Sequence, residues 1–183
     1  MKYVVCDLDG TLFNVEHRLH LLANCRNEED YDRFHMEHIN DVVYPSILGI
    51  INTYTAAFGY DVKFIFVTGR HEKFRESTVK QLNELVFSPE HYVLYMKSSY
   101  ELYTPEYITT VIDNLKIKCD GLDNILFVLD DRPSTVKLYR EAGLTCLQTR
   151  NSSGFIEDVK KESSCTTMSS NDDDDTWFHP FND

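Results

Sequence analysis

The sequence lacks the features that would assign it to a membrane or to a secretory pathway. No hydrophobic stretch approaches the length of a membrane span, and the N-terminus has no charged segment followed by a long apolar one. It also lacks Cys-x-x-Cys spacings, and an odd, scattered set of cysteines is typical of a reducing cytosol. These cysteines are Cys6, Cys25, Cys119, Cys146 and Cys165. We therefore expect a cytoplasmic protein without a membrane partner.

Basic residues are scarce. The chain has 18 lysines and arginines against 30 aspartates and glutamates, which gives a formal net charge of −12. Tight, nonspecific binding to duplex DNA needs many Lys and Arg contacts with phosphates, so we expect none here. A nucleotide or a strand end needs only a local basic pocket and is not excluded. The sequence also has no Gly-x-x-x-x-Gly-Lys-Ser/Thr loop, so any kinase activity must lie on another chain.

Hydrophobic periodicity predicts one α/β domain that ends near residue 158. Apolar runs predict strands at 2–6, 62–67, 92–96, 125–129 and 144–148. Helical patterns lie at 46–58, 71–87, 105–118 and 133–142. Strands that alternate with helices in this way predict a parallel sheet with helices on both faces.

Residues 159–183 have a different character. They include a Ser- and Thr-rich stretch without periodicity and an acidic run at 172–175, which predict a flexible tail. The tail also contains Trp177, Phe178 and Phe181. We expect these aromatic residues either to fold back onto an apolar groove or to dock on a protein partner.

The most informative segment is Asp7-Leu8-Asp9-Gly10-Thr11, which directly follows the first strand. Gly10 allows a sharp turn, so both carboxylates would lie in one crevice at the carboxyl end of that strand. Two anions so close together repel each other. The pattern therefore indicates a hard divalent cation, or one protonated carboxyl group, or both. The alternative interpretation is an ordinary Asp- and Gly-rich turn.

Two further strands end in polar clusters. The strand at 62–67 is followed by Thr68-Gly69-Arg70, and the strand at 125–129 is followed by Asp130-Asp131-Arg132. In a parallel sheet the carboxyl ends of the strands meet at one edge. We therefore expect four carboxylates, a hydroxyl group and two guanidinium groups around one site, instead of an unspecialised solvated edge.

These clusters resemble the motifs of the haloacid dehalogenase superfamily of phosphotransferases. Asp7 to Thr11 are similar to its first motif, Thr68 to its second and Asp130-Asp131 to its fourth. Together with Glu16 to His20 and Arg132-Pro133-Ser134, they most resemble the phosphatase domain of bacteriophage-type polynucleotide kinase/phosphatases and of free-standing phage and bacterial relatives. The resemblance covers about residues 2–150. It implies a Rossmann-like three-layer sandwich and, for a viral protein, the host cytoplasm.

The resemblance also implies a small helical cap at about residues 14–45. We expect two short helices there, at 16–22 and 30–35. Histidines and arginines concentrate in this insertion, either as a polar rim that grips phosphate or base, or as an ordinary polar helix face. A short cap leaves the site open, so that the end of a nucleic-acid strand can enter.

The family mechanism assigns a role to each motif. Asp7 attacks phosphorus to form an aspartyl-phosphate, and Asp9 acts as the general acid and base, for which its pKa should exceed that of Asp7. Mg²⁺ would be held by Asp7, the backbone carbonyl of Asp9, Asp130 and Asp131. Thr68 and backbone amides near Gly10 and Gly69 would donate hydrogen bonds to the phosphoryl group. Arg18, Arg70 and Arg132 are candidates to bind substrate phosphate, although an arginine here could instead orient the acids or form a structural ion pair.

One element of the family pattern is missing. The third motif is normally a lysine about twenty residues before the Asp-Asp pair, where this chain has Thr109 and Thr110. Lys97 and Lys116 are the candidate replacements, and we favour Lys97 because it directly follows a strand. The expected function is a Mg²⁺-dependent phosphomonoesterase acting on nucleic-acid 3′-phosphate ends or on nucleotides. The alternative is a catalytically weak protein of the same fold that binds a phosphorylated ligand or a partner protein.

Overall fold

The computed structural model describes residues 1–23, 25, 27–85, 89–100 and 104–149. The expected tail at 159–183, with its aromatic residues, lies outside these ranges. The core is a five-stranded sheet in the order β5-β4-β1-β6-β7, with every neighbouring pair parallel. Its strands are β1 (Lys2–Asp7), β4 (Val62–His71), β5 (Tyr92–Lys97), β6 (Ile125–Asp130) and β7 (Cys146–Gln148). No helix in the described ranges is long and apolar enough to cross a membrane.

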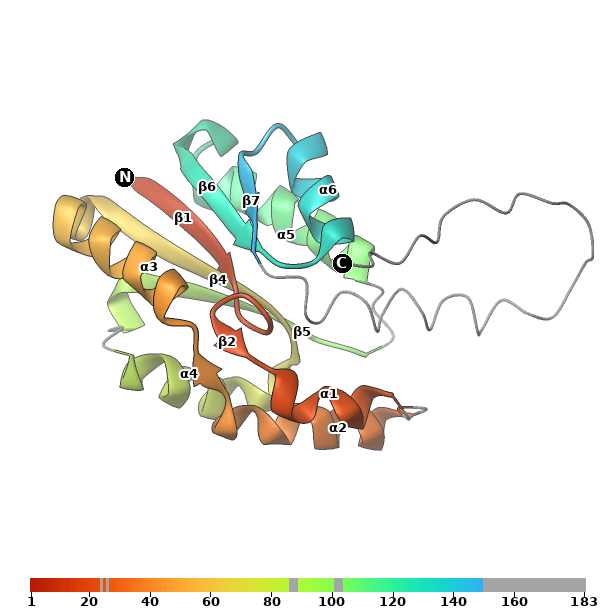
Figure 1. The fold of residues 1–183 in the computed structure, drawn as a ribbon. Coiled ribbons are helices and arrows are strands. Elements are labelled where there is room, and N and C mark those ends of the chain that lie inside the picture. Colours follow the sequence, from red (N-terminus) through yellow and green to blue (C-terminus); the bar gives the residue numbers. More distant parts are fainter. Residues whose placement is uncertain (24, 26, 86–88, 101–103, 150–183) are drawn as a thin grey trace, which may run out of the picture.

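Helices cover both faces of the sheet, as the alternating pattern predicted (Figure 1). One face packs against α3 and α4, and the other packs against α5 and α6. The helices are α3 (Pro45–Phe58), α4 (Arg75–Glu84), α5 (Thr104–Lys118) and α6 (Pro133–Glu141). Short 3₁₀ turns at Gly59–Asp61, Pro89–His91 and Leu122–Asn124 precede β4, β5 and β6. This is the Rossmann-like three-layer architecture that the sequence resemblance implies.

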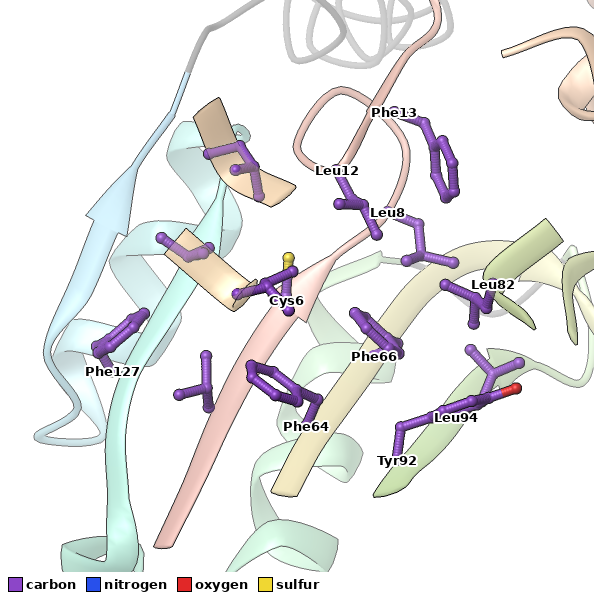
Figure 2. Close-up of a cluster of buried hydrophobic side chains, with 14 of the residues drawn as sticks. Cys6, Leu8, Leu12, Phe13, Phe64, Phe66, Leu82, Tyr92, Leu94 and Phe127 are labelled. Atoms are coloured by element: carbon purple, nitrogen blue, oxygen red, sulfur yellow. The ribbon is translucent and has the colours of Figure 1, made fainter. Parts of the chain in front are cut away.

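Alternating strand residues build two separate hydrophobic cores. In β4, Phe64 and Phe66 enter the core beneath α3 and α4, whereas Ile65 enters the core beneath α5 and α6. Figure 2 shows that Leu8 and Leu12, which follow β1, extend the first of these cores beyond the strand end. Both leucines are fully buried, so apolar packing anchors the chain between the two N-terminal aspartates and again just after them.

The register of the central strands brings the motif residues together. Asp7 is paired with Val67, directly before Thr68, and Cys6 is paired with Leu129, directly before Asp130. The first, second and fourth motifs therefore end side by side on β1, β4 and β6. The crevice at this edge is where ligands bind in open α/β sheets.

Two expected boundaries were wrong. β4 continues through Thr68-Gly69-Arg70 to His71, because His71 rejoins the ladder opposite Lys97 after an irregularity that follows Val67. The helix expected at 71–87 therefore begins later: a 3₁₀ turn at Glu72–Phe74 precedes α4. Arg70 is consequently held on the strand itself and not in a polar cluster that follows it, and its side chain is fully buried.

The insertion after β1 contains the expected short helices. A 3₁₀ turn at Glu16–Arg18 leads into α1 (Leu19–Leu22), and α2 (Glu28–Met36) leads into a 3₁₀ turn at Glu37–Asn40. Asn27 caps α2 by accepting a hydrogen bond from the Asp30 amide at 3.0 Å. The two-residue strands β2 (Phe13–Asn14) and β3 (Val42–Val43) pair antiparallel and close the base of the insertion.

Candidate active site

Three buried carboxyl groups meet at the ends of β1 and β6. Asp7, Asp130 and Asp131 are 8%, 4% and 0% exposed. The Oδ2 atom of Asp7 is buried and has no hydrogen-bond partner among the described residues. Burial, together with the charges of Asp130 and Asp131, raises the pKa of the Asp7 carboxyl well above its usual value. This crowding of negative charge favours a cation at Asp7.

Asp9 lies in the opposite electrostatic environment. Its Oδ1 accepts hydrogen bonds from Arg18 Nη2 at 2.6 Å and from Arg70 Nη2 at 2.6 Å. Its Oδ2 accepts from Arg70 Nε at 3.0 Å and from the Thr68 hydroxyl at 3.2 Å. Burial alone would raise the pKa of Asp9, but the guanidinium groups of Arg70 and Arg18 hold it well below its usual value.

The pKa values of the two N-terminal aspartates therefore differ in the direction opposite to the one expected from sequence, because the pKa of Asp7 is raised and that of Asp9 is lowered. Repulsion between carboxylates raises the pKa of Asp7 and not that of Asp9, because Asp7 lies beside Asp130 and Asp131. No arginine offsets the burial of Asp7 to the same extent. The pKa of Asp9 is lowered by two arginines, Arg70 and Arg18, which only the fold brings next to it.

Arg18 and Arg70 also take a different place from the one expected for substrate-binding residues. Both side chains are fully buried. Arg18 Nη1 donates to the Phe34 carbonyl at 3.2 Å, and Arg70 Nη1 donates to Gln81 Oε1 at 2.8 Å. Arg70 Nη1 also donates to the Thr78 hydroxyl at 3.3 Å, and the other guanidinium hydrogen bonds of the two arginines go to Asp9 and Asp41. These contacts fit the alternative in which the arginines orient an acid, and phosphate binding by Arg18 and Arg70 stays a prediction.

Asp41 is a site residue that sequence reasoning missed. Its side chain is fully buried and accepts from Arg18 Nε at 2.7 Å and from Arg18 Nη2 at 2.6 Å. Arg70 Nη2 donates to the same carboxylate at 3.3 Å, and His17 Nε2 lies 2.8 Å from it. An isolated aspartate in the insertion carries no motif, so only the buried arginines, each in need of a carboxylate, could have pointed to it.

A small pocket opens beside Asp7. It is lined by side chains or backbone from β1, β4, α5 and β6, including Asp7, Thr68, Gly69, Thr104, Tyr107, Asp130 and Arg132. The backbone N–H of Arg132 donates to Asp130 Oδ1 at 2.9 Å, which fixes that carboxylate. Gly69 and Arg132 therefore lie at the pocket beside Asp7, and their expected contact with a phosphoryl group stays a prediction.

Two expected hydrogen-bond donors are used within the protein. The Gly10 N–H donates to the Phe13 carbonyl at 2.9 Å, within a turn for which Gly10 adopts φ 97°. Gly10 therefore shapes the turn, and phosphate binding by backbone amides near Gly10 stays a prediction. The Thr68 hydroxyl donates to Asp9 and accepts from the Arg70 N–H at 3.2 Å, so its oxygen lies between the acid and the pocket.

The two candidate lysines are placed very differently. Lys97 is 8% exposed, and its Nζ donates to Thr104 Oγ1 at 3.0 Å and lies 5.9 Å from the centre of the Tyr107 ring. Both of these neighbours line the pocket of Asp7. Lys116 is exposed, pairs with Asp113 at 2.9 Å, and follows Thr104 by twelve residues, about 18 Å along α5. The fold does not bring Lys116 to the site, because α5 leads away from it.

The site fits Mg²⁺ in part. No group of three or more His, Cys, Asp or Glu side chains in the described ranges is arranged to enclose a metal ion. Mg²⁺ keeps several waters and is usually bound by one or two carboxylates plus substrate phosphate, so it does not need such a cage. The unpartnered Oδ2 of Asp7 beside Asp130 fits that requirement.

Comparisons with known proteins agree with this geometry. Residues 1–153 match the family model described as the polynucleotide kinase PNKP phosphatase domain. No curated protein matches the sequence. A chain in the structure of a Pnkp1/Rnl/Hen1 complex is 22% identical, with a TM-score of 0.56 over 81% of this chain and 46% of that one. A chain in the Pnkp1/Rnl/Hen1 RNA repair complex is 21% identical, with a TM-score of 0.55 over 81% of this chain and 42% of that one.

CbbY from Rhodobacter sphaeroides, solved with phosphate, has a TM-score of 0.54 at 14% identity over 82% of this chain and 86% of that one. This likeness concerns the fold. The present chain spans less than half the length of the two Pnkp1-complex chains that it matches.

Proposed function

This chain belongs to the family of polynucleotide kinase PNKP phosphatase domains, and on that premise we propose that it is a Mg²⁺-dependent 3′-phosphatase of nucleic-acid ends or nucleotides. The observation that carries the proposal is the contrast between the two aspartates. Asp7 has an unpartnered, buried oxygen at the pocket, whereas Asp9 is held in place by two arginines. Asp7 thus lines the pocket with a carboxyl group that has an unpartnered oxygen, and Asp9 beside it is fixed for proton transfer.

One carboxyl oxygen of Asp7 attacks phosphorus, and the bond from phosphorus to the ester oxygen breaks. Asp9 gives its proton to the departing oxygen, and the aspartyl-phosphate remains on Asp7. Asp9 then removes a proton from water, the water oxygen attacks the same phosphorus, and the Asp7–phosphate bond breaks. Free phosphate leaves, and both carboxyl groups return to their starting states.

Asp9 must acquire a proton despite its two arginine partners. Arg18 and Arg70 favour the ionised carboxylate, which suits the second step, in which Asp9 is the base. For the first step, the substrate phosphate brings negative charge next to Asp9, and this raises the proton affinity of the carboxylate. Asp9 is therefore set to alternate between the two forms.

Mg²⁺ would be held by Asp7, the backbone carbonyl of Asp9, Asp130 and Asp131. When bound, it would neutralise charge on the phosphoryl oxygens. Lys97 supplies further positive charge from β5, behind Thr104 and Tyr107, in place of the lysine missing from α5. Two structural neighbours are chains of Pnkp1/Rnl/Hen1 complexes, one of them an RNA repair complex, and this supports a nucleic-acid end as substrate.

The test is a panel of substrates: a 3′-phosphorylated oligonucleotide, the same oligonucleotide with a 5′-phosphate, a 3′-mononucleotide and p-nitrophenyl phosphate. We expect preference for the 3′-phosphates, loss of activity in EDTA and recovery with added Mg²⁺. Asp7→Asn should reduce turnover by at least about 1,000-fold, since the nucleophile is removed. Asp113→Asn, an exposed change on α5, is the matched control. Turnover by Asp7→Asn within tenfold of the parent would refute the mechanism.

A second candidate function is binding of a phosphorylated ligand without efficient turnover. It is favoured by the third-motif positions: the hydroxyls of Thr109 and Thr110 are exposed and bond to the Pro105 and Glu106 carbonyls of their own helix. Neither threonine carries a positive charge, so neither can offset the negative charge at Asp7 as the family's lysine would. A parent protein that binds the 3′-phosphorylated oligonucleotide in the presence of Mg²⁺ but cleaves no member of the panel would favour this candidate.

A further inference from the structure

Four buried charged side chains form a closed ring behind the site. Asp9 Oδ1 accepts from Arg18 Nη2 at 2.6 Å, and the same nitrogen donates to Asp41 Oδ2 at 2.6 Å. Asp41 Oδ2 accepts from Arg70 Nη2 at 3.3 Å, and that nitrogen returns to Asp9 Oδ1 at 2.6 Å. Positive and negative groups alternate around the ring, so that two guanidinium groups are balanced by two carboxylates.

We propose that Asp41 is a positioning residue for the reaction: it holds Arg18 and Arg70 in the one arrangement that aims the Asp9 carboxyl at the leaving group. The proposal rests on the function given above and adds to it a residue that makes no contact with the pocket. The pocket beside Asp7 is lined by ten residues, and Asp41 is not one of them.

The argument begins with the charge balance. Without Asp41, two buried guanidinium groups would face the single carboxylate of Asp9. Arg18 would lose both of the hydrogen bonds that it donates to Asp41, from Nε at 2.7 Å and from Nη2 at 2.6 Å. Buried donors need partners, so Arg18 would turn to the nearest carboxylate or towards water. Either movement would change the orientation of the Asp9 carboxyl group, because its Oδ1 accepts hydrogen bonds from both arginines.

The ring also joins the insertion to the sheet. Arg18 and Asp41 come from the two ends of the insertion, whereas Asp9 and Arg70 come from the segment after β1 and from β4. The position of the insertion on the sheet is therefore coupled to the orientation of the Asp9 carboxyl group. A second contact joins the same parts without touching Asp9: Asp32 of α2 pairs with Lys73 and accepts from Tyr100 Oη at 2.6 Å.

That second contact provides a matched control. Asp41→Asn and Asp32→Asn each remove one carboxylate charge from the insertion, but only the first belongs to the ring. For Asp41→Asn we expect kcat on the 3′-phosphorylated oligonucleotide to fall about 10- to 100-fold, with KM within about threefold, because a slightly misplaced acid slows chemistry more than binding. Asp32→Asn should keep kcat within about twofold of the parent.

Leaving-group dependence separates a positioning role from a structural one. p-Nitrophenol leaves with little need for a proton, so Asp41→Asn should lose less than about fivefold in kcat on p-nitrophenyl phosphate. Equal losses on both substrates, or kcat within twofold of the parent on the oligonucleotide, would overturn the proposal. An inactive parent would overturn the proposed function itself, and this inference with it.

If Asp41→Asn does not fold, the double variant Arg18→Met/Asp41→Leu replaces one pair of opposite charges with apolar side chains and leaves Asp9 with Arg70. Such paired replacements are usually tolerated, because no single buried charge is left without its partner. The double variant should show the same contrast between the two substrates. Parent-like kcat on the oligonucleotide would overturn the proposal.

Discussion

Acidification should destabilise this fold through a buried histidine near the charged ring. His35 of α2 is 6% exposed, its Nδ1 has no hydrogen-bond partner among the described residues, and its ring stacks on Tyr100 with centroids 5.9 Å apart. Burial, with a further contribution from nearby Arg18 and Arg70, lowers the pKa of His35 to about 3, although Asp9 acts in the opposite direction. The folded protein thus holds this imidazole neutral.

The sign and the size of the effect follow from this shift. In the unfolded chain the histidine binds a proton below its usual pKa of about 6.5, whereas in the folded protein it does not do so until about pH 3. The unfolded state therefore binds more protons between these values, and stability falls as pH falls through that window. From above pH 7 to pH 5, the loss is about 1.5 pH units at 1.36 kcal/mol each, or about 2 kcal/mol.

The assay is urea unfolding of the parent and of His35→Phe at pH 7.5 and pH 5.0. Phenylalanine keeps an aromatic ring in the cluster but cannot bind a proton. The parent should lose about 2 kcal/mol more than the variant between the two pH values, and the comparison cancels other titrating groups. His20→Phe, at an exposed position of α1, is the control. An equal pH dependence for the parent and His35→Phe would show that the reasoning is wrong.

Three further outcomes follow from the site. Mg²⁺ at about 100 times its Kd should raise the Tm by about 5 °C or more, and Asp130→Ala should abolish this rise; a shift that persists would place the ion elsewhere. Lys97→Ala should lower kcat by at least about tenfold while Lys116→Ala leaves it unchanged, as progress curves under saturating substrate can test. Asp9→Asn should cost much less on p-nitrophenyl phosphate than on the 3′-phosphorylated oligonucleotide; equal losses in steady-state assays would argue against Asp9 as the acid.

The sheet could be predicted from sequence because its strands are nearly continuous apolar runs. Val62 to Val67 is the clearest example, since strands buried on both faces show little polar interruption. The continuation of β4 to His71 was not predictable in the same way. Thr68-Gly69-Arg70 has the composition of a loop, and only the pairing of His71 with Lys97 across the sheet shows it to be strand.

The sequence predicted the site residues that lie at strand ends. It did not predict those that are brought together by ion pairs between distant segments of the chain. Asp7 and Asp130 lie together because parallel strands converge. The contacts of Arg18 and Arg70 with Asp9 could not be read from the sequence, because substrate binding and acid orientation require the same residue type. Asp41 was missed altogether, since nothing local distinguishes it from other surface aspartates before the two arginines are seen to surround it.

The charged ring also restricts which substitutions can accumulate in this sequence during evolution. Each of its four members balances the others in a buried setting, so replacing one alone leaves a charge uncompensated, at a cost of about 3–5 kcal/mol. A domain with a total stability of about 5–15 kcal/mol tolerates few such steps. Asp9, Arg18, Asp41 and Arg70 should therefore be inherited as a unit. Homologues that have lost the carboxylate at position 41 should also have lost the guanidinium at position 18.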